Sequence, residues 1–198
     1  MINRIGTALL LTSALITGCS MAHSDPNHPK KNPHPVQRYE VIATTNAPGP
    51  WDKVKGYISY EVVNPKCTPE DKFLGVHAMP ADVGIEVEMT RIAEDTWKGY
   101  FYRDYLQDED YYGLGVCHWD VTSVGSGFAV HGETFGAGDT LNILLSKGPQ
   151  TEYFKISEYT NGTNGNARAL ESTAATPEVV RDPFAFFPIT VAVKEVKP

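Results

Sequence analysis

The chain is 198 residues long and acidic, with 17 lysines and arginines against 24 aspartates and glutamates and a formal net charge of -7. Nucleic-acid binding draws its affinity from cations that neutralise phosphates, so this balance argues against a nucleic-acid partner and favours a basic protein. The part that follows the first 18 residues is long enough for one domain with a substantial core and too short for two.

Residues 1–18 have the layout of a secretory signal peptide. Arg4 is followed by the apolar run of residues 5–16 and then by the small residues Thr17 and Gly18. A membrane-spanning helix needs about 20 apolar residues, whereas this run is shorter and a polar stretch follows it. We therefore expect export of the chain and removal of residues 1–18.

Residues 15–19, Leu-Ile-Thr-Gly-Cys, resemble the lipobox of bacterial lipoproteins. The resemblance implies that Cys19 receives a diacylglycerol on its thiol and an acyl chain on its amine, which together make a durable membrane anchor. Ser20 in place of an aspartate implies sorting to the outer membrane, with the protein facing the periplasm. An ordinary secretory signal with an unmodified Cys19 is the alternative.

Residues 19–37 predict a proline-rich tether. Four prolines lie among Asn, Lys and His residues, with almost nothing apolar to bury. In a polyproline-like conformation the tether would reach on the order of 50 Å, at about 3.1 Å per residue. His23, His28 and His34 have no fixed scaffold between these prolines, so solvated histidines are favoured over metal ligands.

Residues 38–198 predict a single all-β domain. Short runs of β-branched and aromatic residues are broken by Gly, Pro and Asn, and no long amphipathic helix is present. The clearest alternation places Val83, Ile85 and Val87 on one face of a strand. The expected strands are residues 39–45, 56–63, 83–90, 97–106, 115–123, 128–134, 140–145, 153–159 and 189–193. This spacing favours an antiparallel β-sandwich, Ig-like or C2-like, over any α/β arrangement.

Two cysteines remain once Cys19 is lipidated. An even pair in an oxidising compartment predicts a disulfide, and Cys67 and Cys117 are the candidates. Closing a loop of about 50 residues would stabilise the domain by roughly 4 kcal/mol in the chain-entropy model. Two free thiols are the alternative.

The acidic segment, residues 104–113, stands out from its surroundings because it gathers carboxylates and tyrosines. It lacks the central ligand and the bidentate glutamate of an EF-hand. A looser calcium site built from Asp104, Asp108 and Asp110 stays open, although no cofactor is otherwise expected.

The same segment could instead form a surface that binds a protein partner, which is the hypothesis we favour for testing. Carboxylates complement a basic groove, and tyrosines are favoured as anchors of protein interfaces. The candidate partner-binding residues are Asp104, Asp108, Glu109, Asp110, Tyr111 and Tyr112. A solvated turn, whose tyrosines pack inward and whose acids keep a sheet edge soluble, is the alternative.

Each catalytic motif that the chain approaches lacks a member. Val124 stands where the first glycine of a G-x-S-x-G hydrolase elbow belongs. The His-Gly-Glu run at residues 131–133 is not followed by the P-C-x-x-C of the zinc deaminases. His77, His118 and His131 share no helix-turn spacing. We therefore expect neither an enzyme nor a metal site.

Residues 161–188 are the least strand-like part of the domain and predict a long loop near the C-terminus, with a short helix around residues 167–172. A connection of this length in a small domain is typically functional or disordered. Its three phenylalanines, Phe184, Phe186 and Phe187, are expected to pack into the core.

Residues 48–51 (Pro-Gly-Pro-Trp), residues 56–64 and residues 108–119, taken with the lipobox and the β-rich body, resemble the immunity lipoproteins that accompany toxic effectors of bacterium-killing type IV and type VI secretion systems. The resemblance covers about a quarter of the domain. It implies a non-catalytic protein that binds a toxin acting in the periplasm, such as a phospholipase or a peptidoglycan hydrolase, and occludes its active site. A structural or assembly lipoprotein of the envelope, with no toxin partner, is the alternative.

Overall fold

A computed structural model of the chain describes residues 24–162 and 173–197. The predicted signal peptide, Cys19 and the short helix expected over residues 167–172 lie outside these ranges. Among the described residues, no helix is long and apolar enough to cross a membrane.

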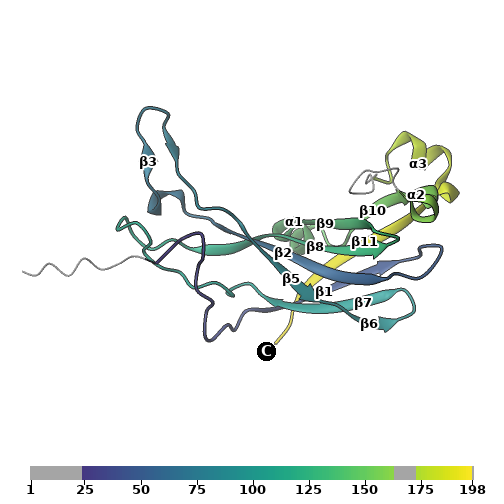
Figure 1. Cartoon of the computed structure of the whole chain (residues 1–198), viewed down its shortest axis with the longest axis horizontal. Helices are drawn as coiled ribbons and strands as arrows, with labels where there is room; N and C mark the ends of the chain where they lie inside the picture. The colour runs from purple at the N-terminus through teal and green to yellow at the C-terminus, as the bar shows by residue number, and fades with distance from the viewer. Residues whose placement is uncertain (1–23, 163–172, 198) are drawn as a thin grey trace, which may run out of the picture.

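Two antiparallel sheets form the body of the domain. The first has the order β10 (Gln150–Lys155), β11 (Phe186–Glu195), β1 (Arg38–Thr45), β7 (Thr96–Tyr102) and β6 (Thr90–Ala93). The second has the order β5 (Val83–Glu88), β2 (Lys53–Val62), β8 (Trp119–Val130) and β9 (Glu133–Thr140). The sheets pack against each other as two elongated layers (Figure 1). The predicted antiparallel β-sandwich is therefore confirmed.

An aromatic cluster fills the space between the sheets. Phe135 of β9 lies with its ring centroid 5.5 Å from that of Phe154 on β10 and 5.6 Å from that of Phe187 on β11. Trp51, from the connection between β1 and β2, packs against Phe135 and against Phe128 of β8. Large aromatic side chains contribute most of the apolar area that a core of this kind removes from water.

A helix replaces one predicted strand. The strand expected over residues 140–145 is wrong, because α1 (Leu141–Ser146) occupies this stretch. The Thr140 hydroxyl accepts a hydrogen bond from the Ile143 amide at 3.3 Å and caps the helix. Leu141 and Leu144, three residues apart, are both buried on one helical face. A short apolar run fits either structure, and here the cap decides between them.

Other strand boundaries also differ from the prediction. The strands expected over residues 115–123 and 128–134 both overlap one continuous strand, β8, and the strand expected over residues 153–159 ends at Lys155 and is followed by α2 (Ile156–Asn161). β9 was not predicted because it is rich in glycine. A Cβ atom on Gly138 would lie 2.4 Å from the carbonyl oxygen of Val124, so the close approach of β8 and β9 requires glycine there.

The expected loop near the C-terminus contains α3 (Pro177–Arg181) and the 3-10 helix η2 (Pro183–Ala185) in its described part. Phe186 and Phe187 are buried as predicted. Phe184 is 90% exposed, so its expected place in the core is wrong. Strand β11 begins at Phe186, and because successive side chains of a strand point to opposite faces, Phe187 is the one that joins the core cluster.

A hairpin projects from the body between β2 and β5. It follows the 3-10 helix η1 (Pro65–Cys67) and consists of the short strands β3 (Glu70–Asp71) and β4 (Val76–His77). We call residues 68–80 the arm. Figure 1 shows the arm standing away from both layers, at the end of the molecule opposite α2 and α3.

Candidate functional site

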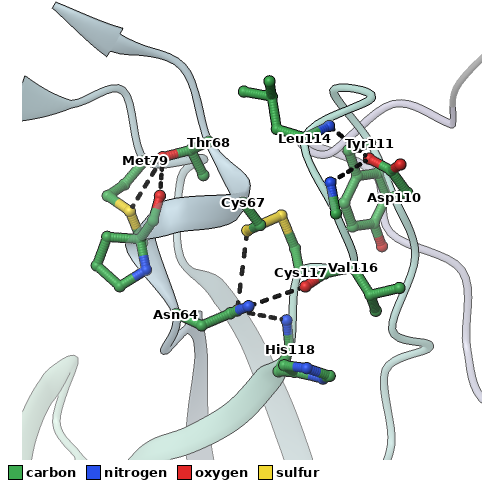
Figure 2. The surroundings of a disulfide bond; sticks show 12 residues. Asn64, Cys67, Thr68, Met79, Asp110, Tyr111, Leu114, Val116, Cys117 and His118 are labelled. Atoms are coloured by element: carbon green, nitrogen blue, oxygen red, sulfur yellow. Dashed lines mark hydrogen bonds between the residues drawn. A yellow bond between two sulfur atoms is a disulfide. The ribbon is translucent and has the colours of Figure 1, made fainter.

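The predicted disulfide between Cys67 and Cys117 is confirmed, with the two Cα atoms 5.2 Å apart. It joins η1, at the base of the arm, to the β7–β8 loop, residues 103–118, which contains the acidic segment. Asn64 reinforces this junction (Figure 2): its side-chain oxygen accepts from the His118 amide at 2.7 Å, and its amide donates to the Val116 carbonyl at 2.8 Å. We call this part of the molecule, together with residues 24–37, the stapled end.

Hydrogen bonds make the base of the arm rigid. The Thr68 hydroxyl donates to the Pro65 carbonyl at 2.7 Å, and the Ala78 amide donates to the Pro69 carbonyl at 2.8 Å. The His77 ring nitrogen Nδ1 lies 3.0 Å from the Thr68 carbonyl oxygen. Thr68 itself is buried, so the arm is fixed where it leaves the disulfide.

The tip of the arm is a tight turn that displays apolar side chains. The Asp71 carboxylate accepts from the amides of Phe73, at 2.9 Å, and Leu74, at 3.1 Å. Gly75 has a φ of +67°, a left-handed conformation that glycine adopts without strain, and its amide donates to the Asp71 carbonyl. The turn leaves Phe73 95% exposed and Leu74 65% exposed. Phe73, Leu74 and the nearby Val76 are all exposed, and such a group of apolar side chains makes the tip a candidate contact surface.

Asp108 holds the β7–β8 loop against the start of β8. One carboxylate oxygen accepts from the buried Trp119 amide at 2.9 Å, and the other lies 2.7 Å from the His118 ring nitrogen Nδ1. The carboxylate still has a solvent-facing side, because the Asp108 side chain is 42% exposed. Asp108 is therefore both a structural acceptor and an accessible charge.

Asp110 and Tyr111 shape the tip of the same loop. The Asp110 carboxylate accepts from the amides of Leu114, at 3.1 Å, and Gly115, at 3.3 Å (Figure 2). Tyr111 is buried; its hydroxyl donates to the Gln107 carbonyl at 3.0 Å and accepts from the Trp119 indole at 3.1 Å. Burial raises the pKa of the Tyr111 hydroxyl. Tyr111 is thus a core residue of the loop.

Tyr112 is half-buried and packs against the core from the other side of Tyr111. Desolvation raises the pKa of its hydroxyl, and the nearby charge of Asp25 raises it further. The alternative of inward-packing tyrosines therefore describes Tyr111, and Tyr112 in part.

Asp104 and Glu109 bind the segment that precedes β1. The Asp104 carboxylate accepts from the amides of Val36, at 2.8 Å, and Gln37, at 2.9 Å. Glu109 lies 2.9 Å from the Lys30 ammonium, and hydrogen bonds from Ser24 and Lys30 hold the pKa of the Glu109 carboxyl below its usual range. Both carboxylates are turned toward the chain itself.

These contacts change the picture of the tether. Asn32 donates its amide to the Tyr105 carbonyl at 2.7 Å, and Gln107 donates its amide to the Lys30 carbonyl at 2.8 Å. Residues 30–37, expected to be part of a free tether over residues 19–37, lie on the domain. Its two prolines, Pro33 and Pro35, leave this segment few ways to pair its own backbone, so the acidic segment supplies the partners. The expected reach of about 50 Å does not apply to residues 30–37.

The three acids of the candidate calcium site have separate partners. Asp104 binds amides before β1, Asp108 binds the start of β8 and Asp110 binds the tip of its own loop. Within the described residues, no three His, Cys, Asp or Glu side chains are grouped so that they could hold a metal ion. The structure does not bring Asp104, Asp108 and Asp110 together.

The three histidines considered above lie in separate elements: His77 in the arm, His118 in the β7–β8 loop and His131 in the turn between β8 and β9. A shallow hollow of about 580 Å³ opens on the outer face of β8 and β9 and is lined mainly by glycines, serines and threonines. Asp139 is the carboxylate that lines it, and no histidine does. The arrangement supplies no pair of acid and base across the hollow.

The arm is the feature that sequence reasoning missed. The run Lys72-Phe73-Leu74-Gly75 was a usable signal, because two adjacent apolar residues before a glycine, outside any alternating strand, indicate a displayed turn. Of the predicted partner-binding residues, Asp108, Asp110 and Tyr112 keep accessible surface beside the arm base, whereas Asp104, Glu109 and Tyr111 mainly hold the stapled end together.

No protein-family model matches this chain, and no curated protein or solved structure shows significant similarity to it.

Proposed function

We propose that the chain is an immunity protein of the periplasm, anchored to the outer membrane through lipid on Cys19, that binds and neutralises a toxic secreted effector such as a phospholipase or a peptidoglycan hydrolase. The lipobox resemblance supports the location, and the acidic β7–β8 loop is the surface that we assign to the effector.

The observation that carries the proposal is the way in which this loop is fixed before any partner arrives. Asp108 and Asp110 accept hydrogen bonds from three backbone amides, Asp108 also contacts the His118 ring, and the disulfide fixes the end of the loop at Cys117. A loop that is already ordered loses little conformational entropy on binding, as in inhibitors that work by blocking a site.

The composition of the loop surface is typical of a protein interface. Leu114 and Val116 expose their side chains at its tip, and the carboxylates of Asp108 and Asp110 lie around them. An apolar centre with a charged rim suits a cleft that carries basic groups at its edge. The overall negative charge of the chain would steer such a partner toward it.

Binding is favoured over catalysis for this end of the molecule. The ionisable groups of the loop are committed to backbone amides and to each other, and the hollow on β8 and β9 is lined mainly by small neutral residues, with Asp139 as its carboxylate. A hydrolase would instead need a nucleophile or water held between a matched acid and base.

The test is a competition between sibling cells. A strain that lacks the gene should be killed by siblings whose secretion systems are active, and it should survive once the wild-type gene is restored. A deletion strain that survives such siblings contradicts the proposal. Envelope defects in the absence of any attacker would favour a structural lipoprotein instead.

The interface is tested with isosteric variants. Asp108→Asn with Asp110→Asn keeps a carbonyl oxygen for each loop amide and removes two charges, whereas charge reversal would also break the loop. We expect about tenfold weaker binding to the purified effector, because two rim charges are worth roughly 0.7 kcal/mol each. Glu94→Gln with Asp95→Asn, in the exposed turn between β6 and β7, is the matched control and should bind as the wild type does.

A further inference from the structure

We infer that the tip of the arm, Phe73 and Leu74, is a second membrane contact that seats in the interfacial layer of the bilayer to which Cys19 is attached. This inference goes beyond effector binding and depends only on the lipid anchor of the proposed function. The occupant of the exposed apolar tip is therefore a lipid surface.

The segment that leads to Cys19 lies against the β7–β8 loop. Ser24, the first described residue, donates a hydrogen bond to Glu109, and Asp25 lies close enough to Tyr112 for its charge to act on that hydroxyl. Ser24 is five residues after Cys19, and five extended residues span at most about 18 Å. The β7–β8 loop is therefore held within a short distance of the acylated residue.

The arm leaves the domain at the same end as the segment that leads to Cys19. The disulfide joins the arm base directly to the β7–β8 loop, and Figure 1 shows the arm and the start of the described chain at one end of the long axis. Six residues separate Cys67 from Phe73, which in extended strand corresponds to about 20 Å. The tip of the arm therefore lies within about 20 Å of the disulfide, at the same end of the molecule as the segment that leads to Cys19.

The chemistry of the tip suits the interfacial layer of a bilayer. The amides of Phe73 and Leu74 are satisfied by Asp71, so the turn can leave bulk water without unpaired backbone donors. Aromatic rings are favoured at the level of lipid headgroups, and the adjacent Lys72 can extend its ammonium to lipid phosphates. Val76, also exposed, continues the apolar surface on the β4 side.

The opposite end offers a natural comparison. Phe184 is 90% exposed beside α3, at the far end of the long axis, where no anchor leaves the domain. With Phe73 in the interface, the long axis points away from the membrane and Phe184 lies in the periplasm. The arm then fixes the orientation of the domain, while the acyl chains supply the affinity.

The experiment uses the full mature lipoprotein in vesicles of phosphatidylethanolamine and phosphatidylglycerol, with bromine on part of the acyl chains. Phe73→Trp should lose most of its added fluorescence relative to unbrominated vesicles, and Phe184→Trp should lose none. The native Trp97 and Trp119 are buried and Trp51 packs against the core, so the three add a background that the wild type measures. Equal quenching of both variants, or no quenching of Phe73→Trp, overturns the inference, as does failure of the wild type to float with the vesicles.

Two further variants separate this inference from effector binding. Phe73→Ser with Leu74→Ser should abolish the fixed orientation of the domain on the membrane, so that other parts of the domain become quenched by, or cross-linked to, the lipid. The same variant should leave the affinity for the effector in detergent unchanged. Asp108→Asn with Asp110→Asn, combined with Phe73→Trp, should leave the quenching unchanged. If the tip instead binds a protein, Phe73→Ser with Leu74→Ser should weaken the affinity for the effector and leave the orientation on the vesicles unchanged. That result contradicts a lipid occupant.

Discussion

The body of the sandwich and the stapled end differ in the interactions that stabilise them. In the body, Phe128, Phe135 and Phe154 are fully buried between two sheets, and the free energy of folding comes from apolar burial. In the stapled end, a disulfide and carboxylate-to-amide hydrogen bonds fix the chain, while Phe73 and Leu74 face outward. Leu106 and Tyr111 of the stapled end are buried as well, so the contrast is sharpest at the tip of the arm, where hydrogen bonds close the turn and apolar side chains are free to meet a partner or a membrane.

The largest expected effect lies in the body. Phe135→Ala should lower the free energy of unfolding by about 5 kcal/mol, the upper end for such truncations, because the ring, on β9 of one sheet, contacts two aromatic residues of the other sheet and its removal leaves a cavity. Chemical denaturation measures the loss. Phe184→Ala, which removes an exposed ring, should change it by less than about 0.5 kcal/mol. Similar losses for both variants would erase the contrast between buried and displayed aromatics.

The disulfide comes next. Cys67→Ser with Cys117→Ser should cost up to about 4 kcal/mol, since the cross-link closes a loop of 50 residues in the unfolded chain. Amide hydrogen exchange should show the first loss of protection in the arm and the β7–β8 loop, before β1 and β11. Uniform loss across both sheets would show that the stapled end and the body are one cooperative unit.

A smaller effect separates charge from hydrogen bonding at Asp108. Asp108→Ala leaves the buried Trp119 amide without its acceptor and should cost about 2 kcal/mol. Asp108→Asn retains an acceptor oxygen and should cost less than half of that. Thermal unfolding of the two variants side by side gives the answer, and equal losses would mean that the negative charge itself holds the loop.

The smallest effect concerns pH. Burial alone would raise the pKa of Glu40, but the hydrogen bond and charge of Lys194, at 3.0 Å, and the charge of Lys98, at 3.7 Å, hold it below its usual value near 4.5. A lowered pKa stabilises the fold above the unfolded value, and this contribution is lost as the pH falls through the folded value. Glu40→Gln should therefore cost about 1 kcal/mol at pH 7 and less at pH 3. An equal cost at both values would contradict the ion pairs.

The sequence predicted the body better than the stapled end, for physical reasons. Runs of apolar residues predicted β1, β5 and β11, because these strands pack a face against the core. β9 carries two glycines in eight residues and gave no such signal, since its place depends on close packing against β8. Local pattern also does not distinguish a strand from α1 in a short apolar run.

The acidic segment shows what composition alone leaves open. Its carboxylates and tyrosines were visible in the sequence, but their partners, Val36, Lys30 and Trp119, come from distant parts of the chain. Which acids are committed to the fold and which stay accessible is a property of tertiary structure. The pairing of Cys67 with Cys117 was predictable because it needed only a count and a compartment.

The intact mass of the mature N-terminus, taken from protein extracted from membranes, is the most direct test of the lipid anchor. The mature chain should begin at Cys19 and carry a diacylglycerol on sulfur and a fatty acid on nitrogen. An unmodified thiol at Cys19, or a mature chain that begins at another residue, would contradict both the membrane-anchored immunity protein and the seating of the arm in the bilayer.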